Sequence, residues 1–348
     1  MEIDIQPFTV HKQVPLTISR GRSASNTNLW LRLRAEGIEG WGEATPFSVT
    51  RGELPSLPRL QAQARALIPL LADLHPLQRQ AIAKRLASQA LDSSLRAALD
   101  TALHDWLGKR SGLPLWQLWG LEPHQSPPTA VTIGLSSPGA AQARLRRWQE
   151  QLEARVLKVK LGSPEGLAAD RALVLAVREA APEASISVDA NGGWSLAAAI
   201  AMSEWLADQG VVHLEQPLAA GQEAELRELY ERSPLPIFAD ESCFTSADVL
   251  KLADRVHGVN LKLMKAGGLS AVWQAIHTAR AAGLHVMLGC YSDSGLANTA
   301  MAQLASLADY VDLDSHLNLR DDPFRGARLV AGRLQPRDQP GLGVERCD

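Results

Sequence analysis

The alternation of apolar and polar residues predicts a small antiparallel sheet at the start of the chain. Residues 2–10 and 28–43 alternate in this way, and the second segment, "NLWLRLRAEGIEGWGE", does so around a Glu-Gly turn. From about residue 57 to 108 the pattern changes to the helical period. One apolar stripe of that region is formed by Leu95, Leu99, Ala102, Leu103, Trp106 and Leu107. Strands followed by helices predict an α+β domain that ends near residue 122.

Short apolar or β-branched runs, separated mostly by alanine-rich stretches, occupy residues 123–314. The runs are "TAVTIGL", "VLKVKL", "SISVDA", "VVHLEQ", "IFADES", "GVNLKL", "HVMLGC" and "YVDLDS". From the second run onward, their ends follow one another at intervals of 22 to 29 residues, which is room for one strand and one helix. Eight such units predict a (β/α) barrel of parallel strands. A doubly wound open sheet is the alternative, but it usually carries a GxGxxG turn that this sequence lacks.

The last segment, residues 315–348, has too little apolar periodicity for another barrel unit. We expect this tail to pack back on the first domain.

Composition and charge narrow the class of partner. The chain is 46% hydrophobic and 21% charged, with a net charge of −3 and dispersed basic residues, so we expect a small-molecule partner and neither nucleic acid nor membrane. The opening "MEIDIQPFTVHKQ" lacks the apolar core of a signal peptide, which favours a cytoplasmic protein. The odd number of cysteines, Cys243, Cys290 and Cys347, suits a reducing compartment, and we assign them neither a disulfide nor catalysis.

Carboxylates fall at the ends of three successive predicted strands: Asp189 in "SVDANGGW", Glu215 in "HLEQP" and Asp240 in "FADES". The C-terminal ends of barrel strands form the rim where side chains meet a ligand. A single acidic residue there is more often a helix cap or a solvated charge. Three in register would repel one another unless a cation lay between them, and oxygen ligands favour Mg²⁺ or a close relative such as Mn²⁺.

Lysines flank this carboxylate group. Lys158 and Lys160 lie two apart on the second predicted strand and therefore share the inner face, while Lys262 ends the sixth strand across the barrel. Crowding by Lys158 and a metal cation would favour the neutral form of Lys160, which a general base requires. The alternative is that Lys158 and Lys262 are only counter-ions of the carboxylates. We interpret Lys265 as a surface or loop charge.

A divalent cation between two lysines predicts removal of a proton α to a carboxylate. The cation stabilises the enediolate charge that develops as the proton leaves. Removal by one lysine and return by the opposite one inverts the carbon, so epimerisation is the simplest outcome.

The motifs "VLKVKLG", "DANGGW", "LEQP", "ADES" and "KLMKAGG" together resemble the enolase superfamily, in its muconate-lactonizing-enzyme subgroup. The resemblance covers nearly the whole chain, including "GWGEATP" and "LDTALHDWLGKRSGLPLWQLWG". It implies a capping domain at 1–122 completed by the tail, and a (β/α)₇β barrel at 123–314. It implies one Mg²⁺ per subunit on the three carboxylates, Lys160 and Lys262 as the acid/base pair, and Lys158 in assistance. Members often form homo-oligomers, which the sequence does not decide.

Substrate-binding residues follow from the same resemblance. Asp312 and Asp314 in "YVDLDSH" are similar to the DxD motif of dipeptide epimerases, which receives the substrate's α-ammonium group. The alternative is a capped strand end with two solvated aspartates. Asp293 in "GCYSDSG" lies where relatives carry an acidic residue after the seventh strand, so we expect a substrate contact there.

The loop "ISRGRSASN" carries Arg20 and Arg22 and corresponds to the loop that closes over the site in this family. An arginine there would pair with an acidic substrate side chain, which makes an L-Ala-D/L-Glu type epimerase the leading interpretation. A mobile, solvated basic loop is the alternative.

Two rival functions differ in kind. An o-succinylbenzoate synthase or N-succinylamino acid racemase would use the same scaffold, but its substrates have no free ammonium group for Asp312 and Asp314 to bind. A non-catalytic barrel binding protein would be expected to lack a metal ligand or a lysine, and none is missing here.

Overall fold

The computed structural model describes residues 1–47 and 56–347, and its first part is a three-stranded antiparallel sheet. The strands are β1 (Glu2–Ile18), β2 (Gly21–Ala35) and β3 (Ile38–Ala44). Glu36 and Gly37 connect β2 to β3 with positive φ angles of 53° and 75°, as a type I′ hairpin turn requires. The predicted alternation of apolar and polar residues therefore corresponds to a real sheet.

Helices α1 (Leu57–Leu71) and α3 (Ser93–Ser111) pack on this sheet, and α2 (Arg79–Ala87) packs against α1. The predicted stripe of α3 faces the sheet, since Leu95, Leu99 and Trp106 are fully buried. Gly40 and Gly42 of β3 make this close packing possible, because a Cβ atom at either position would overlap the backbone of α3. A short helix, α4 (Leu115–Leu118), and a 3₁₀ turn, η1 (Pro123–Gln125), lead to the barrel.

The barrel is built from eight parallel strands within the described residues, hydrogen-bonded in sequence order. They are β4 (Val131–Ile133), β5 (Val156–Lys160), β6 (Ser185–Asp189), β7 (Val211–Glu215), β8 (Ile237–Ala239), β9 (Gly258–Lys262), β10 (His285–Gly289) and β11 (Tyr310–Asp312). A bridge between Thr129 and Val311 closes the sheet, with Ala130 N donating to Val311 O at 2.8 Å. Sequential order and closure confirm the predicted barrel and exclude the doubly wound sheet.

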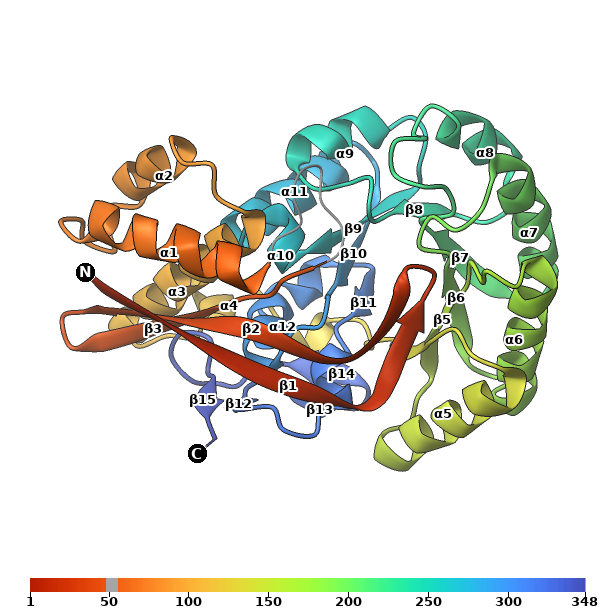
Figure 1. Ribbon diagram of the computed structural model, residues 1–348, viewed down its shortest axis with the longest axis horizontal. Coiled ribbons are helices and arrows are strands. Elements are labelled where there is room, and N and C mark those ends of the chain that lie inside the picture. The colour runs from red at the N-terminus through yellow and green to blue at the C-terminus, as the bar shows by residue number, and fades with distance from the viewer. Residues whose placement is uncertain (48–55, 348) are drawn as a thin grey trace.

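Helices surround the barrel on its outside (Figure 1). They are α5 (Pro138–Gln151), α6 (Leu167–Ala180), α7 (Leu196–Asp208), α8 (Leu226–Arg232), α9 (Ser246–Leu252), α10 (Leu263–Ala266), α11 (Leu269–Ala281) and α12 (Gly295–Ala302). Two 3₁₀ turns flank the last strand: η2 (Ala305–Leu307) before it and η3 (Ser315–Asn318) after it. Because β11 is followed by a turn and not by a full helix, the architecture is (β/α)₇β.

The tail returns to the N-terminal sheet and helices, as expected. Its short strands are β12 (Phe324–Arg325), β13 (Arg328–Val330), β14 (Arg333–Gln335) and β15 (Glu345–Arg346). Leu319 forms a bridge with Lys12 of β1, and Leu342 N donates to Asp105 Oδ1 of α3 at 2.8 Å. Both chain ends therefore lie on the same side of the molecule (Figure 1).

The hairpin of β1 and β2 reaches over the C-terminal ends of the first barrel strands (Figure 1). Leu135 N donates to Thr17 O at 2.9 Å, and Arg20 Nη1 donates to Asn191 O at 2.9 Å. The rim that carries the predicted carboxylates thus lies beneath the sheet of the first domain. In the described part of the chain, no helix is long and apolar enough to cross a membrane.

Candidate active site

Three buried carboxylates converge at the rim of the barrel. Asp189 ends β6, Glu215 ends β7 and Asp240 follows β8, so three neighbouring strands each supply one. One oxygen atom from each lies within 4.8 Å of those from the other two, and all three residues are buried. Three converging carboxylates offer only hard oxygen ligands, and this donor set fits Mg²⁺. The structure thus brings together the three residues that the sequence predicted.

Lys158 lies beneath the carboxylates, fully buried inside the barrel. Its Nζ is 2.7 Å from Glu215 Oε2, 2.7 Å from Asp312 Oδ2 and 3.3 Å from Asp189 Oδ2. The pattern of β5, in which alternate residues share a face, explains why Lys158 and Lys160 both point inward. Lys158 is therefore the ammonium that binds several carboxylates at once.

Lys160 and Lys262 lie on opposite sides of the carboxylate group. Lys160 Nζ donates to Asp189 Oδ2 at 2.6 Å, whereas Lys262 Nζ donates to Asp240 Oδ2 at 2.7 Å. Their strands, β5 and β9, are four positions apart in the eight-stranded order of the described barrel, which places them across it from each other. This is the two-sided arrangement that the sequence predicted.

Burial, the lysines and the carboxylates themselves shift the pKa values of the groups in this cluster. Although burial acts to raise the pKa of Asp189, the attraction of Lys160 and Lys158 outweighs it and holds that pKa below its ordinary value. Burial and the charge of Asp189 raise the pKa of Glu215 to about 7. Burial opposes the charged form of Lys158, yet its carboxylate neighbours, Asp312 first, raise the pKa of that amine well above its usual value.

Lys265 corrects one interpretation. It is 2% exposed, and its Nζ donates to Asp240 Oδ1 at 2.6 Å and to Asn260 O at 2.9 Å, with a further bond to Asp240 O. The reading as a surface or loop charge is therefore wrong. The short helix α10 turns the side chain back under the rim, where it orients Asp240. The second lysine in "KLMKAGG" was the available signal.

A cavity of about 310 Å³ opens beside Lys160. Apolar residues of the β1 segment, including Val14, Pro15 and Leu16, form one wall. The charged and polar residues that line it are Thr17, Arg22, Thr132, Ser136, Arg144, Lys160, Cys290, Tyr291, Asp312, Asp314, Ser315 and Asn318. Predicted substrate-binding and predicted catalytic residues thus share one cavity.

Asp312 and Asp314 both line this cavity but have different partners. Asp312 Oδ2 accepts from Lys158, while its Oδ1 is buried and has no hydrogen-bond partner among the described residues. Asp314 Oδ2 accepts from Thr132 N at 2.7 Å. Burial, with Asp312 nearby, raises the pKa of Asp314 to about 6. The two carboxylates are buried at a cavity wall, and they are not the solvated aspartates of the alternative reading.

Arg22 and Arg20 lie in different surroundings in the structure. Arg22 lines the cavity, whereas Arg20 forms an ion pair with Glu241 Oε1 at 2.7 Å and closes over the loop at Asn191. Arg20 thus ties the β1–β2 hairpin to the rim. A further arginine of the cavity, Arg144, lies on α5, where no motif in the sequence marks it as part of a site.

Asp293 does not line the cavity in the described structure. It is 2% exposed, and its Oδ2 accepts from Tyr291 N at 3.1 Å. Burial raises the pKa of Asp293. Burial and the charge of Asp293 together raise the pKa of Glu43 to about 8. The expected substrate contact of Asp293 therefore has no support here, because the side chain turns toward the first domain.

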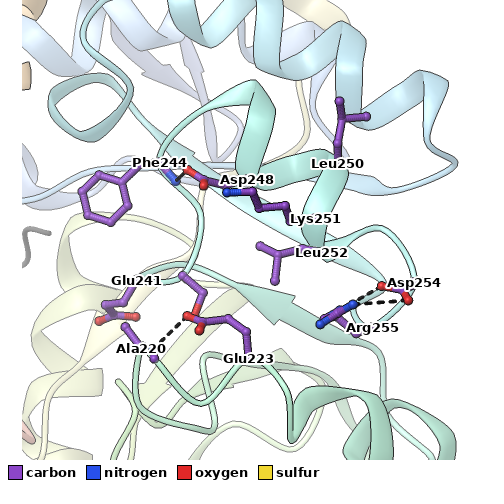
Figure 2. A pocket seen from close by; sticks show the side chains of 12 residues that line it. Ala220, Glu223, Glu241, Phe244, Asp248, Leu250, Lys251, Leu252, Asp254 and Arg255 are labelled. Atoms are coloured by element: carbon purple, nitrogen blue, oxygen red, sulfur yellow. Dashed lines mark hydrogen bonds and ion pairs between the residues drawn. The ribbon is translucent and has the colours of Figure 1, made fainter.

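A second, larger cavity of about 890 Å³ lies between the loop after β7 and helix α9 (Figure 2). Glu241, Glu223 and Phe244 line it, and Figure 2 shows the Asp254–Arg255 ion pair at its outer edge. The predicted lysine pair is not among the described residues of its wall. The smaller cavity, which Lys160, Asp312 and Asp314 line, is therefore the candidate substrate cavity.

Comparison with known families covers both parts of the chain. Residues 2–120 match the N-terminal domain of the mandelate racemase / muconate lactonizing enzyme family. Residues 140–347 match the enolase C-terminal domain-like family.

Similar proteins span the whole chain. A hydrophobic dipeptide epimerase of Roseobacter litoralis is 41% identical to this chain. The alignment covers 99% of this chain and 98% of that protein. An L-Ala-D/L-Glu epimerase of Bacteroides thetaiotaomicron is 31% identical, and the alignment covers 99% of this chain and 88% of that protein. The crystal structure of a dipeptide epimerase from Enterococcus faecalis V583, complexed with Mg and the dipeptide L-Leu-L-Tyr, superimposes with a TM-score of 0.89 at 28% identity, covering 99% of this chain and 98% of that one.

Proposed function

Because the chain belongs to the mandelate racemase / muconate lactonizing enzyme family of the enolase superfamily, we propose that it is a dipeptide epimerase. The reaction inverts the α-carbon next to the dipeptide's carboxylate by moving one proton off and one proton on. It is an isomerisation, so no oxidant, reductant or second substrate is needed. The similarity of the whole chain to proteins named as dipeptide epimerases supports this assignment of the reaction.

The observation that carries the proposal is the pair of lysines on opposite sides of one carboxylate group. Lys160 contacts Asp189 and Lys262 contacts Asp240 from strands that face each other across the barrel. One base on each side of a planar enediolate can remove a proton from one face and return a proton to the other. A binding protein does not need bases on both sides of the site, whereas a two-base epimerase does.

Recognition of a free amino terminus rests on Asp312 and Asp314. An ammonium group that enters the cavity meets two buried carboxylates, one of which, Asp312, has an oxygen atom without a partner among the described residues. A charge-assisted hydrogen bond there would fix the N-terminal residue and so the position of the second α-carbon. N-succinylated substrates carry no ammonium group, which favours the dipeptide over the racemase and synthase alternatives.

Asp189, Glu215 and Asp240 would hold one Mg²⁺, and their hard oxygen donors suit Mn²⁺ as well. When bound, the cation stabilises the negative charge that grows on the substrate carboxylate as the α-proton leaves. Lys158 supplies a fixed positive charge beneath the same carboxylates. We propose that it assists by balancing charge and that it does not exchange the proton itself.

The acid/base cycle then needs only the chain's own lysines. One of Lys160 and Lys262 starts as the amine and takes the α-proton on its side, and the other starts as the ammonium and donates to the opposite face. The first domain excludes water by covering the rim with the β1–β2 hairpin, which Arg20 anchors on Glu241. In this proposal, residues 1–122 are the capping domain, 123–314 the barrel domain and 315–348 the tail.

Two classes of second residue fit the cavity. Arg22 and Arg144 favour an acidic side chain, as an L-Ala-D/L-Glu type epimerase would bind. The apolar wall of Val14, Pro15 and Leu16 favours a hydrophobic side chain, in line with the name of the Roseobacter litoralis relative. We therefore propose a dipeptide epimerase with both classes as candidate substrates.

The test is α-deuteration of dipeptides by the purified protein with Mg²⁺ in D₂O, read by mass spectrometry. The panel contains Ala-Glu, Ala-Leu and Leu-Tyr in both configurations at the second residue, with an N-succinyl amino acid and the o-succinylbenzoate precursor as rivals. Mass gain on dipeptides supports the proposal, and their relative rates reveal the side-chain class. Activity on the rivals alone would reject it in favour of the synthase or racemase, and no activity on any compound would favour the binding protein.

Lys160→Ala and Lys262→Ala are the matched variants of this test. Each is expected to lose exchange from one epimer by a factor of at least about 10² while exchange from the other epimer survives. If either single variant kept full epimerisation, the two-base mechanism would be wrong.

A further inference from the structure

The aromatic ring of Tyr291 lies on the ammonium group of Lys262. The Nζ atom is 4.4 Å from the ring centroid, a distance at which a cation is attracted to the face of an aromatic ring. Tyr291 belongs to the loop between β10 and α12, and it also lines the substrate cavity.

A residue of the first domain fixes the ring from another direction. Phe47 stacks on Tyr291 with centroids 4.6 Å apart and ring planes 8° from parallel. The hydroxyl group of Tyr291 is buried, and none of the described residues forms a hydrogen bond with it. Its ring therefore makes the specific contacts, and its hydroxyl group makes none within the described protein.

The loop that carries Tyr291 is tied to all three strands of the N-terminal sheet. Lys12 of β1 donates to Ser292 Oγ at 3.0 Å, and Asn28 of β2 donates to Ser292 O at 3.1 Å. Glu43 of β3 accepts from Ser294 N at 3.1 Å. The side chains of Lys12, Asn28 and Glu43 are buried, and the bond from Ser294 N to Glu43 is itself buried. The position of Tyr291 is thus set by the first domain, although its backbone belongs to the barrel.

Lys262 needs such support more than Lys158 does. Lys158 is held by three carboxylates, whereas the described contacts of the Lys262 ammonium are Asp240 and the Tyr291 ring. A flexible four-carbon stem places its amine poorly without a second contact. Proton transfer requires the amine nitrogen to lie about 3 Å from the α-carbon, and small misplacements of a base slow the reaction strongly.

We propose that Tyr291 is a positioning residue for Lys262, through which the N-terminal sheet controls proton transfer on one face of the substrate. This inference rests on the proposed epimerase function. Its consequence is that damage to the ring slows exchange on the Lys262 face and spares exchange on the Lys160 face.

The experiment measures initial α-deuteration in D₂O from each epimer of a dipeptide that the wild-type protein turns over. Lys262→Ala identifies the epimer whose proton Lys262 removes. Tyr291→Leu removes the ring, and Tyr291→Phe keeps the ring and removes the hydroxyl group. Tyr310→Leu, which removes a barrel ring in contact with Phe238 and His213, is the control for loss of an aromatic side chain.

The expected result is a loss of about 10- to 100-fold in exchange from the Lys262 epimer for Tyr291→Leu, with exchange from the other epimer within about threefold of wild type. Tyr291→Phe is expected to retain both rates, and Tyr310→Leu to leave their ratio unchanged. Equal loss on both faces in Tyr291→Leu, no loss on either face, or failure of Tyr291→Phe to retain exchange would each overturn the inference. Absence of exchange in the wild-type protein would instead reject the proposed function, so the two failures are distinguishable.

Discussion

Lys158 Nζ and Asp312 Oδ2, 2.7 Å apart, join β5 to β11 through the interior of the barrel. The same ammonium contacts Glu215 of β7 and Asp189 of β6, so one buried cation neutralises carboxylates from three strands other than its own. Such a cluster is costly to bury and more costly to break, because removal of one partner leaves the others uncompensated.

Lys158→Met should therefore destabilise the protein by about 3 to 5 kcal/mol, as measured by the free energy of unfolding in denaturant without divalent cations. Lys251→Met on the exposed surface of α9 is the matched control and should change stability by less than about 0.5 kcal/mol. Equal stability of the two variants would mean that Lys158 does not hold the cluster together.

Asp314→Asn should weaken dipeptide binding without weakening metal binding. Asparagine keeps an oxygen atom for Thr132 N but loses the charge that attracts the substrate's ammonium group. Loss of a charge-assisted hydrogen bond corresponds to about 1.5 to 3 kcal/mol, or a rise in KM of about 10- to 100-fold. Steady-state kinetics and a metal titration check both halves, and a loss of metal affinity would show that Asp314 has been assigned to the wrong group.

Mg²⁺ should stabilise the fold through the three carboxylates. At 100 times its dissociation constant a ligand of the folded state adds about 2.7 kcal/mol, which thermal unfolding detects as a higher midpoint. Glu215→Gln should abolish most of this rise, whereas Glu179→Gln on the exposed side of α6 should retain it. The same rise in both variants would place the cation elsewhere.

Glu43 should make stability depend on pH. Burial and the nearby Asp293 raise its pKa from 4.5 to about 8 in the folded protein. The folded chain therefore keeps a proton that the unfolded chain releases between these values, and stability falls as the pH rises from about 4.5 through 8. The slope from one group is at most about 1.4 kcal/mol per pH unit.

Comparison of wild type with Glu43→Gln isolates this effect. Two other carboxyl groups lie near Glu43: Asp293, which faces it, and Asp322, which accepts from Gly295 N at the start of α12. Burial raises the pKa of Asp322 to about 6, so this residue makes stability fall with rising pH in both proteins. Unfolding midpoints measured from pH 5 to 8 should fall less steeply in the variant. Parallel curves would contradict the assignment of the titration to Glu43.

The rim residues were predictable because strand period and unit spacing constrain them. Asp189, Glu215 and Lys160 end their strands, so the barrel topology alone brings them together. Residues beyond a strand end are not constrained in this way. Lys265 lies in the four-residue helix α10. The turn of that helix directs its side chain toward Asp240.

Asp293 and Arg144 illustrate the same limit. Asp293 belongs to a loop whose direction depends on hydrogen bonds to the N-terminal sheet, which no local pattern specifies. Arg144 reaches the cavity from α5, where its guanidinium stacks on Trp148 at 3.9 Å from the ring centroid. A charged residue on a surface helix gives no sign in the sequence that it is directed toward a cavity.

The return of the tail to the first domain has a mechanical consequence. Leu342 is hydrogen-bonded to Asp105 of α3, and strand β1 belongs to the sheet on which α3 packs. Both chain ends are therefore attached to the same body, formed by the N-terminal sheet and its helices. Tension applied between the two ends would shear β1 and the tail away from that body before it loaded any strand of the barrel. The chain would open first above the rim, and the closed ring of parallel strands would be the last part to yield.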